Sequence, residues 1–393
     1  MLKWGFIGIG QGGNNIVDIF AKKFPTIAIN TAKQDLDLEN IPIDLRIHTK
    51  INDGGGAGKD IKKGEEAIIQ YKDKIKDKIE MVMRDVGYIW VVAGLGGGTG
   101  SLGLVQLIQV LMEMGKIHGI ICTLPCEDEG TQEKINAFIA LHQIYEAHRK
   151  SNNFRGMVLL DNEELKKYVL SKGNYSYESF WGEANGYIYQ KFNSLYEYSS
   201  KAGITSFDAE DYNRMFMEKG TMIFVENEFD FNDSVSDTVL ASKVKEMWEN
   251  PIFLTGEKKN ATGTALILER PSGFDRDGKA INRLFKEIKN TINSGLFCRG
   301  VYCNKNITDL IRQKPMKIFT LLTGIPFPKE EISQLKQKAE GEINSLRDKS
   351  NDTELSFDLK DMVDFIQENN GEPKIEMLDF TVFKKEQTLT WSF

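Results

Sequence analysis

Two glycine-rich turns, each between an apolar run and a helical pattern, limit what this chain can fold into. Trp4–Ile7 leads into Gly8-Ile9-Gly10-Gln11-Gly12-Gly13, and Tyr88–Gly94 leads into Leu95-Gly96-Gly97-Gly98-Thr99-Gly100-Ser101. Where glycine removes the β-carbon, backbone amides can close around phosphate oxygens, and the start of the next helix adds partial positive charge. Two such turns in one sheet suit a triphosphate.

Short apolar runs alternate with helical patterns through the first half of the chain. Strands are expected at 4–9, 26–30, 88–94, 117–124 and 157–160, and helices at about 12–22, 64–85, 101–114 and 131–150. Parallel strands need crossover connections, which helices supply. The pattern therefore predicts an α/β fold with a parallel sheet covered on both faces.

The pattern changes after a long aromatic-rich helix expected over 175–202. Further strands are expected at 221–225, 265–269, 296–304 and 317–323, with helices near 237–249 and 279–293. We therefore predict four parts: a nucleotide-binding domain (1–174), the central helix (175–202), a smaller α/β activation domain (203–328), and a C-terminal helix and tail (329–393).

Two other nucleotide-binding motifs compete with this interpretation. Gly8, Gly10 and Gly13 satisfy the Rossmann pattern of a dinucleotide oxidoreductase, but Asn30-Thr31 stands where that family needs an acidic residue. The run from Asp53 to Asp60 resembles a P-loop, but it lacks the first glycine and the hydroxyl residue that binds Mg²⁺. That run is either a loop beside the γ-phosphate or a solvated linker.

Composition and charge disfavour several other classes of protein. The net charge of −7 argues against direct nucleic-acid binding, which usually needs a basic excess. We expect no membrane segment and a cytoplasmic location, because no apolar run approaches the length of a spanning helix. The spacing of the four cysteines is unlike that of zinc ligands, so we expect reduced, mostly buried thiols and no metal site formed by protein ligands.

Gly96-Gly97-Gly98-Thr99-Gly100-Ser101 resembles the signature loop of the tubulin/FtsZ superfamily, and other segments over about 1–330 follow in that family's order. The resemblance implies GTP/GDP as ligand, with Mg²⁺ bound mainly through the phosphates. It implies phosphate-side contacts from Gly10, Gln11, Gly12, Gly13, Asn14, Asn30, Thr31, Gly54, Gly55, Gly56, Ala57, Gly58, Gly96, Gly97, Gly98, Thr99 and Gly100, and a ribose-side loop at Pro125.

The resemblance also implies how the nucleoside is recognised. Glu129 would face the ribose, Asn162 the ribose or guanine, and Asn185 the guanine edge, for which an amide offers both donor and acceptor. Trp181 lies four residues before Asn185 on the same helix face, where it could stack on the base or simply pack in the core. Glu133 stands where FtsZ usually has arginine.

Catalysis would need acids from another subunit. The segment Ser206–Tyr212 resembles the superfamily's catalytic loop, in which Asp208 and Asp211 would orient water on the GTP of a neighbour. Asp208 could also merely cap a helix, within a capping box that begins at Thr205. Head-to-tail contact of this kind, repeated without closure, gives a filament of identical subunits.

Within the superfamily, the chain looks most like the plasmid- and phage-type TubZ group. That resemblance is carried by Thr123-Leu124-Pro125, Leu160-Asp161-Asn162, Phe207-Asp208-Ala209 and the segment 324–329. It implies segregation of plasmid or phage DNA through a DNA-binding adaptor protein. An FtsZ-like division GTPase is the alternative. The aromatic and basic end, 380–393, would either contact the adaptor or a neighbouring subunit or be a disordered tail.

Overall fold

The computed structural model describes residues 2–51, 55–173, 176–230, 237–271, 279–292, 294–304 and 315–349. Residues up to Leu335 form one compact unit, and of the second unit, Lys336–Phe393, the described part continues a helix that begins in the first. The expected tail at 350–393, with its aromatic and basic end at 380–393, lies outside the described residues.

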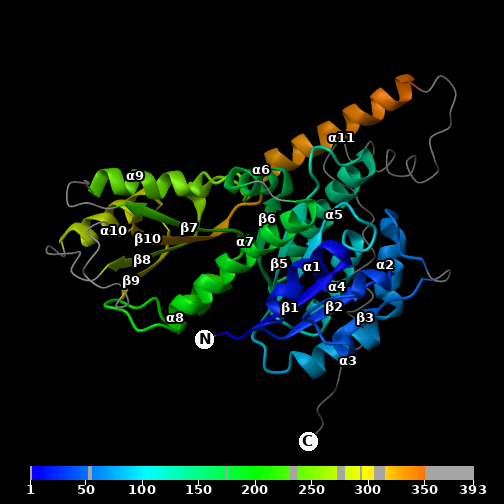
Figure 1. Ribbon diagram of the computed structural model, residues 1–393, viewed down its shortest axis with the longest axis horizontal. Helices are drawn as coiled ribbons and strands as arrows, with labels where there is room; N and C mark the ends of the chain where they lie inside the picture. Colours follow the sequence, from blue (N-terminus) through cyan, green and yellow to red (C-terminus); the bar gives the residue numbers. More distant parts are fainter. Residues whose placement is uncertain are drawn as a thin grey trace, which may run out of the picture. The chain divides into compact units, whose positions relative to one another are not determined.

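Strands and helices alternate in the first half of the chain, as the sequence predicts (Figure 1). The strands are β1 (Trp4–Ile9), β2 (Thr26–Asn30), β3 (Arg46–His48), β4 (Tyr88–Gly94), β5 (His118–Leu124) and β6 (Phe154–Asp161). The helices are α1 (Gly10–Phe20), α2 (Ile61–Gln70), α3 (Lys72–Val82), α4 (Leu102–Glu113), α5 (Thr131–Lys150) and α6 (Asn162–Lys172), with short 3₁₀ turns at Gln34–Leu36 and Ile43–Leu45.

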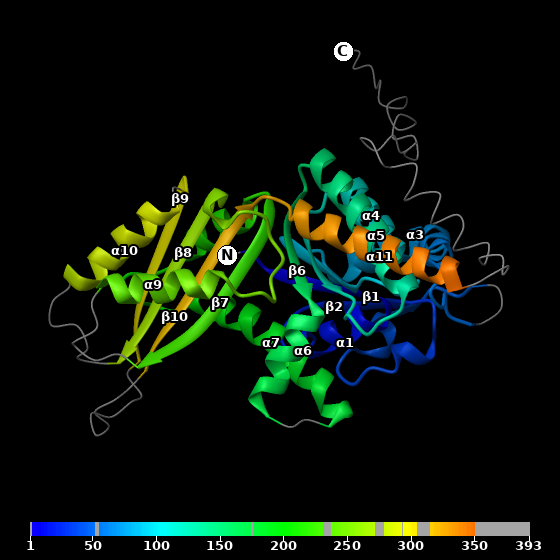
Figure 2. The same cartoon turned by 90° about the horizontal axis from the view of Figure 1, so that it is seen from above.

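The second half begins with the long helix α7 (Tyr177–Tyr198), which lies between the two groups of strands in Figure 1. The remaining elements are α8 (Ala209–Met217), β7 (Gly220–Asp230), α9 (Asp237–Trp248), a 3₁₀ turn at Lys258–Asn260, β8 (Gly263–Pro271), α10 (Lys279–Thr291), β9 (Leu296–Asn304), β10 (Pro315–Ile325) and α11 (Lys329–Lys349). Figure 2 shows α9 and α10 side by side over these strands.

The strands form one sheet in the order β3-β2-β1-β4-β5-β6-β7-β10-β8-β9. From β3 to β6 every pairing is parallel, so all these strands end at the same edge of the sheet. The β6–β7 pairing consists of two residue pairs, Gly156 with Gly220 and Met157 with Thr221. Beyond it, β10 pairs antiparallel with β7 and β8. The mixed α/β class expected from the sequence is confirmed.

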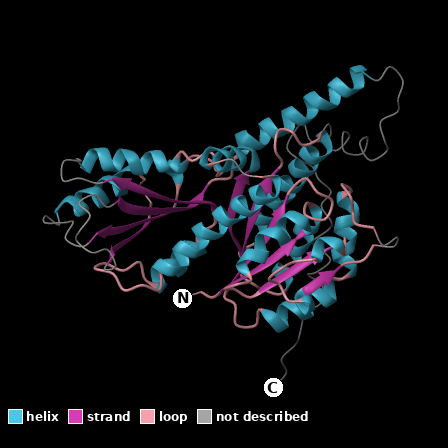
Figure 3. Cartoon of the chain, viewed as in Figure 1, coloured by secondary structure: helices cyan, strands magenta, loops and turns pink. Residues whose placement is uncertain are grey.

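Helices cover both faces of the parallel strands, as Figure 3 shows. Trp4 and Phe6 of β1 belong to an aromatic core with Phe20 of α1 and Phe192 of α7, and the Phe6 and Phe20 rings lie 4.2 Å apart. The alternate residues of β1 point to the other face, which α4 and α5 cover. Alternation therefore fixes which side each strand residue takes.

Four local features differ from the sequence-based expectation. The helix expected over 64–85 is two helices, because Tyr71 has φ −99° and ψ 11° and interrupts the helical geometry. It also begins earlier, since the Asp60 side chain accepts from the Lys62 and Lys63 amides and caps α2. The short strand β3 and the helix α6 were not anticipated.

Candidate nucleotide-binding site

The first glycine turn lies at the carboxyl end of β1, and α1 begins there directly. Gly10 has a φ of 72°, and a β-carbon on it would come within 3.0 Å of the Gly100 nitrogen. No side chain caps the start of α1, so its first amides have no side-chain acceptor. The two glycine turns therefore lie against each other, with a helix N-terminus facing the space between them.

The second turn is shaped by Ser101 before α4 begins. The Ser101 hydroxyl accepts from the Gly96 amide at 3.1 Å and donates to the Gly97 carbonyl at 2.7 Å. Gly96 has a φ of 120°, which a residue with a side chain rarely adopts. Like α1, α4 has no side-chain cap, so its start is a second N-terminus suited to an anion.

A chain of hydrogen bonds joins the segment 55–60 to these turns. The Ala57 amide donates to the Thr31 hydroxyl at 3.0 Å, and the Thr31 and Thr99 hydroxyls lie 2.7 Å apart. Asn30, at the end of β2, donates to Asp35 at 3.2 Å and accepts from the Ala32 amide. The loop expected beside a γ-phosphate is thus attached to the second turn through two threonine hydroxyls.

These segments surround a cavity of about 1200 Å³ at the carboxyl edge of the parallel strands. Of the residues expected to bind nucleotide, the cavity is lined by Gly10, Gln11, Gly12, Asn30, Thr31, Gly56, Ala57, Gly58, Gly97, Gly98, Thr99, Gly100, Glu129, Asn162, Trp181 and Asn185. Sixteen of the twenty-two expected positions are therefore brought to one cavity, although they come from seven separate segments.

Six expected positions do not line the cavity or cannot be placed. Gly13 packs on β4, where a β-carbon would lie 2.0 Å from the Val92 oxygen. Asn14 is fully buried and bonds both backbone groups of Ile29, so its side chain ties α1 to β2. Gly55, Gly96 and Pro125 border the site without lining it, and Gly54 lies outside the described residues.

The far end of the cavity is formed by α6 and α7. Trp181 is 39% exposed and stands edge-on to Phe180, with the ring centroids 5.0 Å apart. Ile188 and Leu165 line the same end, so the cavity offers both an apolar wall and the Asn162 and Asn185 amides. Phe180, Leu165 and Ile188 were missed because their helical spacing is equally typical of core packing.

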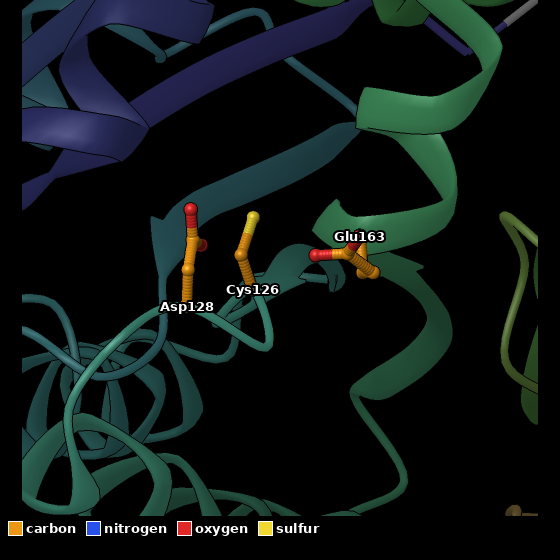
Figure 4. A group of neighbouring side chains, drawn as sticks. All are labelled: Cys126, Asp128 and Glu163. Atoms are coloured by element: carbon orange, nitrogen blue, oxygen red, sulfur yellow. The ribbon is translucent and has the colours of Figure 1, made fainter.

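Acidic groups surround the loop after β5. A Glu129 carboxylate oxygen accepts from the Cys126 amide at 2.7 Å, and burial raises the pKa of Glu129. Cys126, Asp128 and Glu163 lie near one another in Figure 4, with their potential ligand atoms within 4.8 Å of one another. Asp128 is paired with Lys166 at 2.8 Å, Glu163 accepts from the Glu127 amide, and burial raises the pKa of Cys126 to about 12. Asp128 and Glu163 therefore already have partners within the protein and the Cys126 thiol stays protonated, so we assign this group no metal.

The two expected catalytic acids lie at the other end of β1. Asp208 caps α8, because its side chain accepts from the Glu210 and Asp211 amides at 2.9 and 3.0 Å. It does so as the N-cap residue itself and not within a capping box that begins at Thr205. The Leu2 amide, just before β1, donates to Asn213 of α8 at 2.8 Å. Burial, together with the nearby Asp211 carboxylate, raises the pKa of the Cys298 thiol.

The length of β1 separates these acids from the cavity. Tyr212 packs on Trp4 at the start of the strand, with ring centroids 5.2 Å apart, whereas Gly10 at its end lines the cavity. Six residues of strand at about 3.3 Å each span roughly 20 Å. Asp208 and Asp211 therefore cannot contact a ligand in the cavity of their own subunit.

These features define an α/β nucleotide-binding protein whose two glycine-rich phosphate loops each end a parallel strand and begin a helix. Residues 4–169, which hold both loops, match the family model described as "Tubulin/FtsZ family, GTPase domain". Residues 4–169 thus form a GTPase domain of the tubulin/FtsZ family, a match that supports GTPase activity and not that of a dinucleotide oxidoreductase.

Similarity to known proteins extends over most of the chain. The chain is 24% identical to the tubulin-like protein TubZ of Bacillus cereus over 429 residues, covering 96% of this chain and 92% of that protein. It is 27% identical to the tubulin-like protein CetZ of Pyrococcus furiosus, covering 86% and 92%. A GTPγS-form protofilament of TubZ from Bacillus thuringiensis serovar israelensis has the same fold, with a TM-score of 0.72 and 20% identity, covering 89% and 95% of the two chains. Among the described residues, no helix has the length and apolar character to cross a bilayer.

Proposed function

We propose that this protein is a filament-forming GTPase of the TubZ kind, which hydrolyses GTP at head-to-tail contacts between identical subunits. One observation carries the proposal: the cavity and the acidic pair Asp208 and Asp211 lie at opposite ends of β1. A subunit with this arrangement has a binding site at one end and the groups for hydrolysis at the other. Each active site would therefore be completed by the next subunit.

The cavity supplies the contacts that GTP requires. The amides at the starts of α1 and α4 would hold the phosphates, with Thr31 and Thr99 contributing hydroxyls. Trp181 would stack on guanine while the Asn185 amide reads its edge. The described carboxylates that line the cavity already have partners: Asp128 is paired with Lys166, Asp35 accepts from Asn30, and Glu129 accepts from the Cys126 amide. We therefore propose that Mg²⁺ is held mainly by phosphate oxygens.

Hydrolysis would proceed on the γ-phosphate of the adjoining subunit. Asp208 and Asp211 orient a water molecule, whose oxygen attacks the γ-phosphorus as the bond to the GDP oxygen breaks. The Asp208 carboxylate takes up the proton that the water releases. Loss of the γ-phosphate removes a ligand from loop 55–60, and the contact between subunits weakens.

Head-to-tail contacts between unlike surfaces extend indefinitely when rotation does not close a ring. A helical model of TubZ-Bt is a two-stranded filament, which supports extending this behaviour to a chain that shares its fold. We further propose that the filament moves plasmid or phage DNA through a DNA-binding adaptor, since the net charge of −7 disfavours direct contact with DNA. Deleting residues 380–393 and measuring adaptor binding tests whether that segment is the contact.

The proposal is tested by measuring phosphate release and light scattering together over a range of protein concentrations. We expect GTP to induce scattering and filaments in negative stain, and the turnover per subunit to rise from near zero above a threshold concentration. NAD should produce neither signal. A turnover per subunit that is constant on dilution would contradict hydrolysis between subunits.

A further inference from the structure

Asn136 of α5 is a fully buried amide placed behind two of the phosphate-side loops. Its Nδ2 donates to the Gly96 carbonyl at 2.7 Å and to the Lys59 carbonyl at 2.8 Å. Its Oδ1 accepts from the Gln132 side chain at 3.1 Å. Two backbone segments 37 residues apart in sequence are thus held by the two hydrogens of one nitrogen.

The orientation of this amide is fixed by chemistry. Both groups opposite Nδ2 are carbonyl oxygens, which only accept, so a reversed amide would place oxygen against oxygen. Holding the Gly96 carbonyl also fixes the peptide that follows it. In a trans peptide the N–H points away from the C=O, so the Gly97 amide is directed away from α5. Gly97 lines the cavity, so this amide is directed toward a ligand there.

The same clamp sets the position of the loop beside the γ-phosphate. Lys59 directly follows Gly58, which lines the cavity and whose carbonyl accepts from the Gly98 amide at 3.0 Å. Packing here is tight, because a β-carbon on Gly98 would lie 2.6 Å from the Gly58 oxygen. Lys59 is also ion-paired with Glu133, one turn before Asn136 on α5.

The hydrogen bonds that hold the loop differ in whether a bound nucleotide would compete for them. The bond from Ala57 to Thr31 faces the cavity and uses an amide and a hydroxyl that phosphate oxygens would compete for. The Asn136 bonds use carbonyls on the opposite side, which a phosphate cannot contact favourably. They can therefore persist when a ligand binds and keep the loop amides facing it.

We propose that Asn136 is a positioning residue for recognition of the γ-phosphate. It holds loop 55–60 against the second glycine turn so that their amides converge on a triphosphate. This inference rests on the proposed function, in that the cavity takes GTP. A nucleoside diphosphate has no γ-phosphate to contact loop 55–60. Asn136 therefore contributes to the preference for GTP over GDP without touching either nucleotide.

The test is the ratio of GTPγS to GDP affinity in Asn136→Leu, a replacement of similar size that cannot donate. Titration calorimetry is done with the full chain below the concentration at which it assembles. Losing two hydrogen bonds that orient the loop should weaken GTPγS binding about tenfold, or ~1.4 kcal/mol, and GDP binding less than about threefold. Gln132→Ala, which removes the bond to Oδ1 but keeps both bonds from Nδ2, should leave the ratio unchanged.

If Asn136→Leu does not fold, Asn136→Ser retains one donor in a smaller side chain and should give an intermediate loss for GTPγS. Equal losses for GTPγS and GDP would overturn the proposal, because they would mean that Asn136 serves only to hold the fold. Unchanged affinities for both nucleotides would overturn it as well. Failure of the wild-type protein to bind either nucleotide would instead refute the proposed function, and this inference with it.

Discussion

Replacement of Asp208 separates the two roles that the structure gives this side chain. Its Oδ1 caps α8 by accepting from two amides, and its charge is what the proposed hydrolysis needs. Asparagine is as good an N-cap as aspartate, whereas alanine is a poor one. Asp208→Asn therefore keeps the cap and removes the base, and Asp208→Ala removes both.

The expected magnitudes differ between stability and turnover. Loss of the cap in Asp208→Ala should cost about 1 kcal/mol and lower the melting temperature by at most ~3 °C, while Asp208→Asn should melt like the wild type. Turnover should fall about 100-fold or more in both variants, since neither side chain can take up the proton. GTP affinity and GTP-induced scattering should persist in both.

The assay is phosphate release at a concentration well above the assembly threshold, with melting curves measured on the same preparations. Wild-type turnover in Asp208→Asn would remove Asp208 from the mechanism. Turnover lost only in Asp208→Ala would mean that the residue acts through the helix cap and not through its charge.

Three further outcomes follow from the structure. Trp181→Ala should weaken guanine-nucleotide binding by about 1–3 kcal/mol in a fluorescence titration, while Trp181→Phe should retain most of the affinity. Equal binding by the wild type and both variants would exclude stacking. Burial holds the pKa of His118 and of His148 at about 4, so urea-unfolding stability should fall by up to ~1.4 kcal/mol per histidine per pH unit as pH drops from 6.5 toward 4. Replacing both by Gln should flatten that dependence, and a persistent slope would place its cause elsewhere. Gly13→Ala should lower the free energy of unfolding by more than about 2 kcal/mol, because its β-carbon would lie 2.0 Å from a carbonyl oxygen of β4. The exposed Gly182→Ala on α7 should instead raise it by about 1 kcal/mol. Similar values for both variants would contradict the close packing at Gly13.

The strands of the parallel half could be predicted because each is an apolar run bounded by turn residues. β1, β2 and β4 have the expected bounds, since buried parallel strands show no competing periodicity. β3 was missed because Arg46–His48 is short and polar and is held as an edge strand by pairing with β2. The sequence of α6 begins with the Asp161 cap, but its weak apolar stripe hides the helix.

The site residues could be predicted from the sequence where a glycine-rich turn forms the binding surface. Gly10 and Gly98 are recognisable because close backbone approach needs a missing side chain. Asn14 illustrates the limit: a polar residue in a glycine turn suggested a ligand contact, yet its amide bonds the backbone of β2. Asn136 carries no local signal at all, because both carbonyls that it binds are distant in sequence and only the fold brings them together.

Complementation between two defective variants measures directly whether the acids of one subunit act on the nucleotide of another. Asp208→Asn subunits should bind GTP without hydrolysing it, and Trp181→Ala/Asn185→Ala subunits should retain the acids while binding GTP poorly. Mixed in equal amounts, they should release phosphate several-fold faster than the sum of the two proteins assayed alone. A mixture that does no better than that sum would contradict hydrolysis between subunits.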